Sequence, residues 1–295
     1  MSDSSPSADS IRPRRSVLYM PAANARALEK AKGIAADALI FDLEDAVAPD
    51  SKQVARQQAA EAAASGDYGR REITIRCNGL DTPWGADDLV AAAEANPSAV
   101  VIPKVNSVAY LESISDRLDA AGASDSLTVW AMIETPTAIF DVREIAAVDR
   151  VSVLVIGTND LAKELNAQLV PGRSPLIPHL ATAILGAREA GVAILDGVFN
   201  DIANDEGFEL ECQQGFQMGF DGKTLIHPKQ VGIANDVWAP SEEDIEYARR
   251  VVAAFADAEA KGLGVVTVDG QMIENLHVDN ARRTLATADA IRESN

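Results

Sequence analysis

The chain has 295 residues, of which 47% are hydrophobic, and its 26 basic and 45 acidic residues give a formal charge of −19. This composition predicts a globular protein with one large or two small domains, and the negative charge argues against nucleic acid or an anionic membrane as a partner. Two cysteines make no disulfide framework, and no apolar run approaches the roughly 20 residues of a membrane span. Residues 1–14 lack the apolar stretch of a signal peptide, so we expect a disordered leader and a cytoplasmic protein.

Short apolar, β-rich segments alternate with helical segments from residue 15 onward. Eight such units in about 225 residues are what a closed (β/α)8 barrel requires. A doubly wound open sheet is the alternative, but no strand is followed by a Gly-x-Gly-x-x-Gly turn or a Walker loop. The sequence therefore predicts an α/β protein with a TIM barrel over residues 15–239. The expected strands are 15–20, 38–42, 72–77, 99–103, 129–133, 153–156, 192–196 and 222–226.

Residues 240–295 form a longer tail than barrel closure needs. A helix is expected to begin after Ser241, with acidic residues in its first turn that suit the helix dipole. A short β-like segment, 264–270, precedes a final amphipathic helix over about 275–292. We expect this helical C-terminal extension to pack over the barrel mouth of its own subunit or of a neighbour.

Two carboxylates directly follow neighbouring predicted strands, Glu134 after 129–133 and Asp160 after 153–156. Because the carboxyl ends of barrel strands meet at one mouth, these side chains are expected to converge on one metal ion. Oxygen ligands without a nearby His or Cys favour Mg²⁺ over zinc, with Mn²⁺ as an alternative ion. Each carboxylate could instead cap the helix that follows it. Their repetition on consecutive units favours the metal site.

Further polar groups are expected at the same mouth. Arg76 ends the third strand and can hold a substrate carboxylate through two parallel N–H bonds, or form an ion pair with Asp42 or Glu44. Glu44 and its neighbours could orient water on the metal, which would make Glu44 catalytic, or be solvated turn residues. The rest of the expected mouth comprises Arg15, residues 19–22, Asp45, Asn78, Lys104, Asp196 and His227.

Basic residues gather near the first strand of an otherwise acidic chain: Arg14, Arg15, Arg26, Lys30 and Lys32 lie within twenty residues. A phosphorylated ligand such as coenzyme A would explain this concentration of positive charge. A solvated amphipathic helix with scattered Lys and Arg is the alternative.

Seven segments together resemble the citrate lyase beta-subunit and malyl-CoA lyase superfamily: 15–21, 36–47, 76–84, 102–104, 133–135, 157–161 and 222–228. The resemblance spans about residues 14–292. It implies a (β/α)8 barrel with Mg²⁺ on Glu134 and Asp160 and Arg76 on a substrate carboxylate. It also implies CoA across the loop after the first strand, where the family's Pro-Gly is Pro21-Ala22 here, and a homotrimer or homohexamer in which one subunit's C-terminal segment reaches the neighbouring site.

The C-terminal segment departs from the lyase members, which carry Asp in a Met-Ile-Asp motif where this chain has Met272-Ile-Glu274. The extra methylene moves the carboxyl group by about 1 Å, a displacement that can cost roughly a hundredfold in rate. The segments 159–165, 196–198 and 268–277 are most similar to the (3S)-malyl-CoA thioesterase branch. The resemblance therefore implies Mg²⁺-dependent hydrolysis of (3S)-malyl-CoA to malate and CoA, with Glu274 activating water.

Other activities use the same metal and arginine. One is C–C cleavage of malyl-CoA, β-methylmalyl-CoA or citramalyl-CoA to a 2-oxo acid and an acyl-CoA. Another is a carrier-dependent subunit of the citrate lyase type without activity of its own, and a third is a CoA-independent 2-oxo-acid aldolase. A serine-hydrolase triad has no support, because no His and Asp accompany the serines in a suitable pattern.

Overall fold

The computed structural model describes residues 11–294, and the chain divides into two compact units. One unit spans Arg14–Val237, and the other contains the C-terminal residues from Trp238 onward. Most of the predicted leader, residues 1–10, lies outside the described residues; Arg14, its last residue, forms an ion pair with Glu72 at 2.6 Å. Within residues 11–294, no helix has both the length and the apolarity needed to cross a bilayer.

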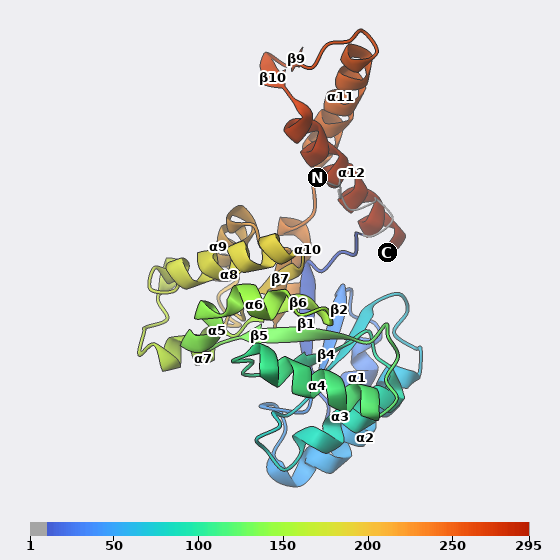
Figure 1. Cartoon of the computed structure of the whole chain (residues 1–295), viewed down its shortest axis with the longest axis vertical. Coiled ribbons are helices and arrows are strands. Elements are labelled where there is room, and N and C mark those ends of the chain that lie inside the picture. The colour runs from blue at the N-terminus through green and yellow to red at the C-terminus, as the bar shows by residue number, and fades with distance from the viewer. Residues whose placement is uncertain (1–10, 295) are drawn as a thin grey trace. The chain divides into compact units, whose positions relative to one another are not determined.

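The larger unit is a closed barrel of eight parallel strands in chain order, each followed by at least one helix (Figure 1). This confirms the predicted (β/α)8 barrel. The strands are β1 (Ser16–Pro21), β2 (Ala38–Asp42), β3 (Glu72–Arg76), β4 (Ala99–Ile102), β5 (Thr128–Ile133), β6 (Val151–Ile156), β7 (Ala193–Asp196) and β8 (Gly222–Leu225). The helices are α1 (Ala25–Ala31), α2 (Lys52–Ala64), α3 (Gly85–Ala95), α4 (Val108–Ala120), α5 (Pro136–Phe140), α6 (Val142–Ala146), α7 (Thr158–Glu164), α8 (Ile177–Ala190), α9 (Asp205–Met218) and α10 (Gln230–Val237).

Alternate strand residues fill the barrel interior. On β5 the inward residues are Trp130 and Met132, and on β6 they are Val153 and Val155. The intervening residues pack under the surrounding helices, so both faces of each strand are apolar, which explains the nearly continuous apolar runs in the sequence. The same alternation brings the next inward positions, Glu134 after β5 and Gly157 after β6, to the mouth of the barrel.

The smaller unit is a pair of helices joined by a β-hairpin: α11 (Glu242–Glu259), β9 (Val266–Val268), β10 (Gln271–Ile273) and α12 (Asn275–Ser294). The predicted start of α11 is a capping box, in which Ser241 and Asp244 each bond the other's backbone N–H. Val251 and Phe255 of α11 pack with apolar residues of the hairpin and of α12 in one core. The unit therefore has a hydrophobic core of its own.

Candidate active site at the barrel mouth

The carboxyl ends of five consecutive strands bring charged side chains to the mouth. Asp42 ends β2, Arg76 ends β3, Lys104 follows β4, Glu134 follows β5, and Asp160 lies in the first turn of α7 after β6. Asp42 and Arg76 are register partners on adjacent strands. The carboxylates of Glu44, Asp160 and Glu134 raise the pKa of Lys104 although its partial burial works against them. The structure thus brings these residues into one electrostatically coupled group.

Glu134 is buried, with only 2% of its surface exposed. Its Oε1 accepts the backbone N–H of Lys104 at 2.7 Å. Gly157 leaves room for the other oxygen, because a Cβ there would lie 2.2 Å from Oε2 of Glu134. Burial raises the pKa of Glu134 to about 7; the Lys104 amide opposes this shift, and the negative charges of Glu44 and Asp160 add to it. A buried carboxylate in such acidic surroundings is suited to a cation.

The two carboxylates fit a magnesium site. Glu134 does not cap α5. The side chain of Thr135 caps that helix instead, by accepting the Ala138 N–H. Asp160 is half-buried and accepts no hydrogen bond from any described residue. No cluster of three or more Asp, Glu, His or Cys suited to a metal occurs in residues 11–294. Two carboxylates with open positions suit Mg²⁺, which commonly keeps several waters and substrate oxygens as ligands.

Arg76 is held in place by acidic side chains. Its Nε and Nη2 donate to the two oxygens of Asp42 at 2.6 Å each, and its Nη1 lies 2.8 Å from Oε2 of Glu44. The ion pairs with Asp42 and Glu44, which the sequence offered as an alternative to substrate binding by Arg76, are therefore both present. Nη1 also lies 3.6 Å from Oδ2 of Asp45. A guanidinium has five N–H groups, so Nη2, whose one contact is Asp42, keeps an N–H for a ligand. The ring of Tyr19 covers one face of the guanidinium, 4.8 Å from Cζ.

Glu44 lies in the loop after β2, next to Arg76. Burial raises the pKa of Glu44 to about 7, with Asp45 and Asp42 adding to the shift while Arg76 and Lys104 oppose it. Lys52, the first residue of α2, fixes this loop: its Nζ donates to the carbonyls of Leu43 and Glu44 at 2.7 Å and to Oδ1 of Asn78 at 2.8 Å.

Sequence reasoning missed Lys52. Lys52 is only 6% exposed, yet it stands at the start of an Ala- and Gln-rich helix. In the sequence it looks like an ordinary surface lysine, so no pattern could have identified it.

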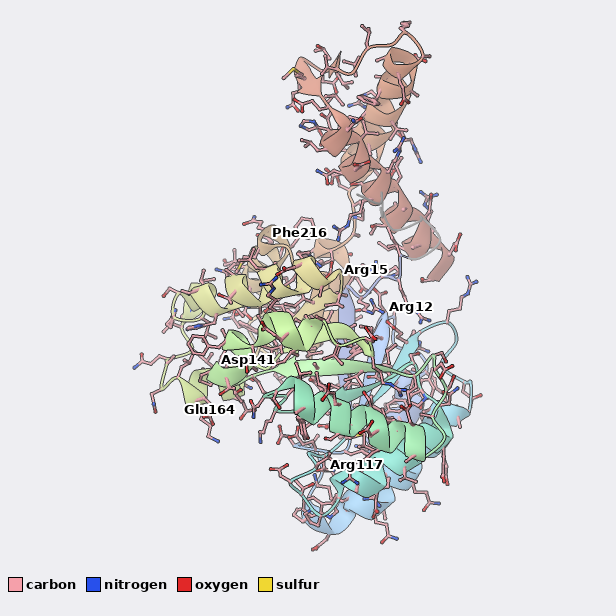
Figure 2. All side chains as sticks on the ribbon, viewed as in Figure 1. Arg12, Arg15, Arg117, Asp141, Glu164 and Phe216 are labelled. Atoms are coloured by element: carbon pink, nitrogen blue, oxygen red, sulfur yellow. The ribbon has the colours of Figure 1, made fainter. Side chains whose placement is uncertain are left out.

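Arg15 lies at the other end of the barrel, which corrects its predicted place at the mouth. It precedes β1, and its guanidinium pairs with Asp37, which precedes β2, at 2.8 Å. Figure 2 labels Arg15 near the start of β1 and Glu164, at the end of α7, on opposite sides of the barrel. The predicted role of Arg15 in substrate binding is therefore replaced by a structural one.

Asp196 ends β7 but does not join the mouth. Leu195 is the inward residue of that strand, so Asp196 points outward, where it accepts hydrogen bonds from Arg173 at 2.6 Å and Lys223 at 2.9 Å. Lys223 also donates to Glu211 of α9. These buried charges tie the barrel wall to α9, and Asp196 is not available to a ligand in the interior.

The other predicted substrate-binding residues lie where the chain leaves β1 at the mouth. Pro21 ends β1 and is partly exposed; Arg26 and Lys30 are exposed on α1. Neither Arg26 nor Lys30 forms an ion pair with a residue of the described range, 11–294. Lys32, by contrast, pairs with Glu29 and Asp67. Two unpaired cations are thus left beside the first strand–helix loop.

Glu274 belongs to the smaller unit, where it follows β10. Its backbone N–H donates to Nδ1 of His277 at 3.1 Å. Its carbonyl accepts the N–H groups of His277 at 2.9 Å and Val278 at 3.3 Å, so Glu274 stands where β10 passes into α12. Glu274 is half-buried there, and the preceding Met272 is 63% exposed.

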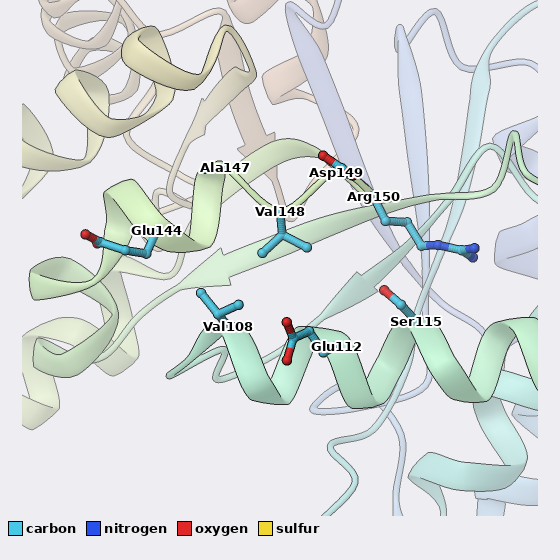
Figure 3. A pocket seen from close by; sticks show the side chains of 8 residues that line it. All are labelled: Val108, Glu112, Ser115, Glu144, Ala147, Val148, Asp149 and Arg150. Atoms are coloured by element: carbon cyan, nitrogen blue, oxygen red, sulfur yellow. The ribbon is translucent and has the colours of Figure 1, made fainter.

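A surface pocket lies on the outer wall of the barrel, away from these residues (Figure 3). It is lined by residues of α4, by Glu144 of α6 and by residues 147–150 between α6 and β6. Its cation, Arg150, is already paired with Asp119. No residue of the mouth contributes to it, so the pocket is not the predicted site.

Comparison with known proteins identifies relatives along most of the chain. Residues 15–228 match the family model described as HpcH/HpaI aldolase/citrate lyase. A (3S)-malyl-CoA thioesterase of Cereibacter sphaeroides is 51% identical over 279 residues, which cover 95% of this chain and 96% of that protein. A citrate lyase subunit beta of Escherichia coli is 35% identical, with 96% of both chains covered.

Solved structures agree with these relatives. The protein CitE from Mycobacterium tuberculosis in complex with magnesium, acetoacetate and coenzyme A superposes with a TM-score of 0.77 at 29% identity, covering 93% of this chain and 97% of that one. The same protein has a structure with magnesium and pyruvate, with a TM-score of 0.68 and 80% of this chain covered. The similarity thus extends over the barrel, its mouth and, in the first structure, most of the C-terminal extension.

Proposed function

The chain belongs to the HpcH/HpaI aldolase/citrate lyase family, and we propose that it is a Mg²⁺-dependent thioesterase that hydrolyses (3S)-malyl-CoA to malate and CoA. The observation that carries this proposal is the 51% identity to a (3S)-malyl-CoA thioesterase over 95% of the chain. The acidic pair at the barrel mouth supports the metal requirement, as does the magnesium in the related CitE structure.

Glu134 and Asp160 would hold the metal. When bound, the ion supplies positive charge that polarises an oxygen of the substrate. The chain's own contribution is to keep both carboxylates in position: the Lys104 amide orients Glu134, and Gly157 leaves it space.

Arg76 binds the free carboxylate of the malyl group in this proposal. Asp42 and Glu44 fix the plane of its guanidinium, and the second N–H of Nη2 would donate to the ligand. Arg76 and the acidic side chains that hold it are called the clamp below. Glu44, as part of this clamp, orients water near the metal. Arg26, Lys30 and Pro21 border the first strand–helix loop and receive the CoA moiety, whose phosphates need the unpaired cations there.

Glu274 is the proposed general base. Its carboxylate takes a proton from a water molecule, whose oxygen adds to the thioester carbonyl carbon; the C–S bond then breaks, and the CoA thiolate takes up a proton. The extension is proposed to deliver Glu274 to the mouth of a neighbouring subunit in a homotrimer or homohexamer. The exposed apolar side chains of Leu263, Val265 and Met272 around the hairpin support such docking.

A reducing, cytoplasmic location is part of the proposal. Both cysteines, Cys77 and Cys212, are unpaired and buried. Burial raises the pKa of the Cys77 thiol well above its usual range, so it is an inert core residue and not a redox group.

A second activity is favoured by the 35% identity to a citrate lyase subunit beta over nearly the full chain. In that case the same residues support C–C cleavage of malyl-CoA to glyoxylate and acetyl-CoA, and Glu274 supplies the proton to the acetyl carbon.

Product analysis separates the two activities. Purified protein is incubated with (3S)-malyl-CoA and Mg²⁺, and free thiol and glyoxylate are followed in parallel. The thioesterase proposal expects thiol and malate without glyoxylate. Equal amounts of glyoxylate and acetyl-CoA would establish the lyase instead. Turnover by the purified protein alone would exclude a carrier-dependent subunit, whereas no turnover of either kind would reject both activities.

A further inference from the structure

Tyr19 is an inward residue of β1, two positions before the strand ends at the mouth. Its ring packs partly buried against the barrel core and lies under the guanidinium of Arg76 at 4.8 Å. Cation–π contact fixes the face of the guanidinium, while Asp42 and Glu44 fix its edges. Tyr19 is thus built into the same clamp as Arg76, although no mechanistic step uses it so far.

The hydroxyl group of Tyr19 is left without a partner among residues 11–294. The chain has four tyrosines, and the other three hydroxyls are all engaged. That of Tyr68 donates to the Leu28 carbonyl at 3.1 Å, that of Tyr110 accepts the Leu80 N–H at 3.1 Å, and that of Tyr247 bonds Gln271 at 3.2 Å. The Tyr19 hydroxyl is not among the enclosed polar atoms that lack a partner, so it is open to solvent at the mouth, where a ligand held by Arg76 can reach it.

The surroundings define what this hydroxyl can do. The ring of Tyr19 contacts Arg76, and the other charges that act on Tyr19 are those of Asp42, Glu134 and Glu44. Burial raises the pKa of Tyr19, and although Arg76 opposes the shift, the three carboxylates add to it. The hydroxyl therefore keeps its proton throughout the physiological range and acts as a hydrogen-bond donor. The ligand group beside Arg76 that accepts such a bond is an anionic oxygen.

We propose that the hydroxyl of Tyr19 donates a hydrogen bond to the substrate carboxylate held by Arg76, and that Tyr19 thereby selects acyl-CoA esters that carry a free carboxylate. The inference rests on the proposed function, whose substrate it makes more specific. A hydrogen bond to a charged group accounts for roughly a tenfold or larger difference in affinity. A ligand with a methyl group in place of the carboxylate makes no use of this donor.

Tyr19→Phe is the informative variant, because it keeps the ring over Arg76 and removes only the hydroxyl. Tyr68→Phe is the matched control, since it removes a tyrosine hydroxyl that bonds the Leu28 carbonyl away from the mouth. Calorimetry in the presence of Mg²⁺ gives the Kd of two probes for wild type and both variants. The probes are malate and 3-hydroxybutyrate, each with the carboxylate at the thioester position converted to an amide. The malate probe then has one free carboxylate, on the hydroxyl-bearing carbon, and the 3-hydroxybutyrate probe has a methyl group there and no carboxylate.

Tyr19→Phe is expected to raise the Kd of malate by about tenfold or more, to leave the Kd of 3-hydroxybutyrate unchanged, and to leave Mg²⁺ affinity unchanged. Tyr68→Phe changes none of these. A malate Kd within about twofold of wild type, equal weakening of both probes, or a loss confined to Mg²⁺ affinity would each overturn the inference. If one of these results is found and the wild-type protein still hydrolyses malyl-CoA, only the proposed role of Tyr19 is rejected. If wild type neither binds malate nor releases thiol from malyl-CoA, the proposed function falls as well.

Discussion

Glu134 makes the metal-free protein less stable as the pH rises. Its pKa of about 7 in the folded chain lies above the usual value of 4.5. Below about pH 4.5 the group is protonated in both states; as the pH rises toward 7 the unfolded chain releases its proton first, so folding loses free energy across this window. Glu134→Gln removes the loss. In EDTA, the unfolding free energy of the variant relative to wild type should therefore rise by up to about 3 kcal/mol between pH 4.5 and 8.

Denaturant titrations of both proteins at pH 4.5 and 8 measure this difference. Glu112→Gln is the control, because Glu112 is an exposed carboxylate on α4. If the stability of Glu134→Gln relative to wild type were the same at both pH values, the buried carboxylate would not carry the cost assigned to it.

Gly157 is expected to be required for metal binding. An alanine Cβ would lie 2.2 Å from Oε2 and 2.5 Å from Cβ of Glu134, so Gly157→Ala must displace that carboxylate. We expect Mg²⁺ affinity, measured by calorimetry, to fall at least about tenfold, the usual scale for a disturbed ligand. Gly232→Ala on α10 has no atom within 4 Å of its new Cβ and should bind Mg²⁺ as wild type does. Equal affinities of the two variants would contradict this packing argument.

A residue could be placed correctly from the sequence only where both the end of its strand and the face on which it lies were predicted correctly. Glu134 was expected at the mouth, and the structure has it there, because it continues the inward alternation of β5. Arg15 was expected there too, but it precedes β1 and so faces the other end. Asp196 ends its strand at the correct end but on the outward face. A shift of one residue decides which face Asp196 lies on, and apolar runs without a polar face do not define that residue. Arg15 is different: it begins the expected strand 15–20, so the sequence already indicated the end of the barrel opposite the mouth.

At the scale of elements, the strands were predictable to within about two residues, since each is a buried β-rich run between polar segments. The segment between β5 and β6 contains two helices, α5 and α6, that meet at Asp141 with φ −99° and ψ 12°. Neither Pro nor Gly stands at that break. Local sequence therefore gave no sign of it, and tertiary packing of α6 against α8 must decide the break.

The loop between β2 and α2 depends on Lys52. Lys52→Met removes a charged donor from the Leu43 and Glu44 carbonyls and from Asn78. The two carbonyls keep one bond each, from Asn78 and from the Val47 N–H, but Oδ1 of Asn78 loses its donor, and Glu44 beside Arg76 is loosened. We expect the KM for malyl-CoA to rise about tenfold and the unfolding free energy to fall by about 3 kcal/mol.

Steady-state kinetics and denaturant unfolding measure the two effects separately. Lys229→Met, which alters an exposed lysine after β8, should change neither. A loss of stability with an unchanged KM would mean that Lys52 supports the fold alone and does not position the clamp.

At the scale of the whole molecule, the fold class followed from the regular alternation of eight units. The sequence did not predict which barrel the extension contacts, because exposed apolar residues do not indicate which surface they bind. The smaller unit leaves Leu263, Val265, Met272 and Leu276 exposed around its hairpin. Exposed apolar side chains in one place usually mark an interaction site. Residue patterns within one chain do not indicate whether this hairpin surface binds the barrel of its own subunit or that of another subunit.

Subunit mixing tests whether Glu274 serves a neighbouring barrel. Arg76→Ala and Glu274→Gln are each expected to be inactive alone. If a site combines the barrel of one subunit with the extension of the next, co-expression in equal amounts should restore about a quarter of wild-type activity, because about one site in four then pairs two intact parts. Thiol release from malyl-CoA by the purified mixed oligomer measures this, with differently tagged subunits to establish that mixing has occurred. Inactive mixed oligomers would instead mean that each extension serves its own barrel, since no subunit would then hold both Arg76 and Glu274.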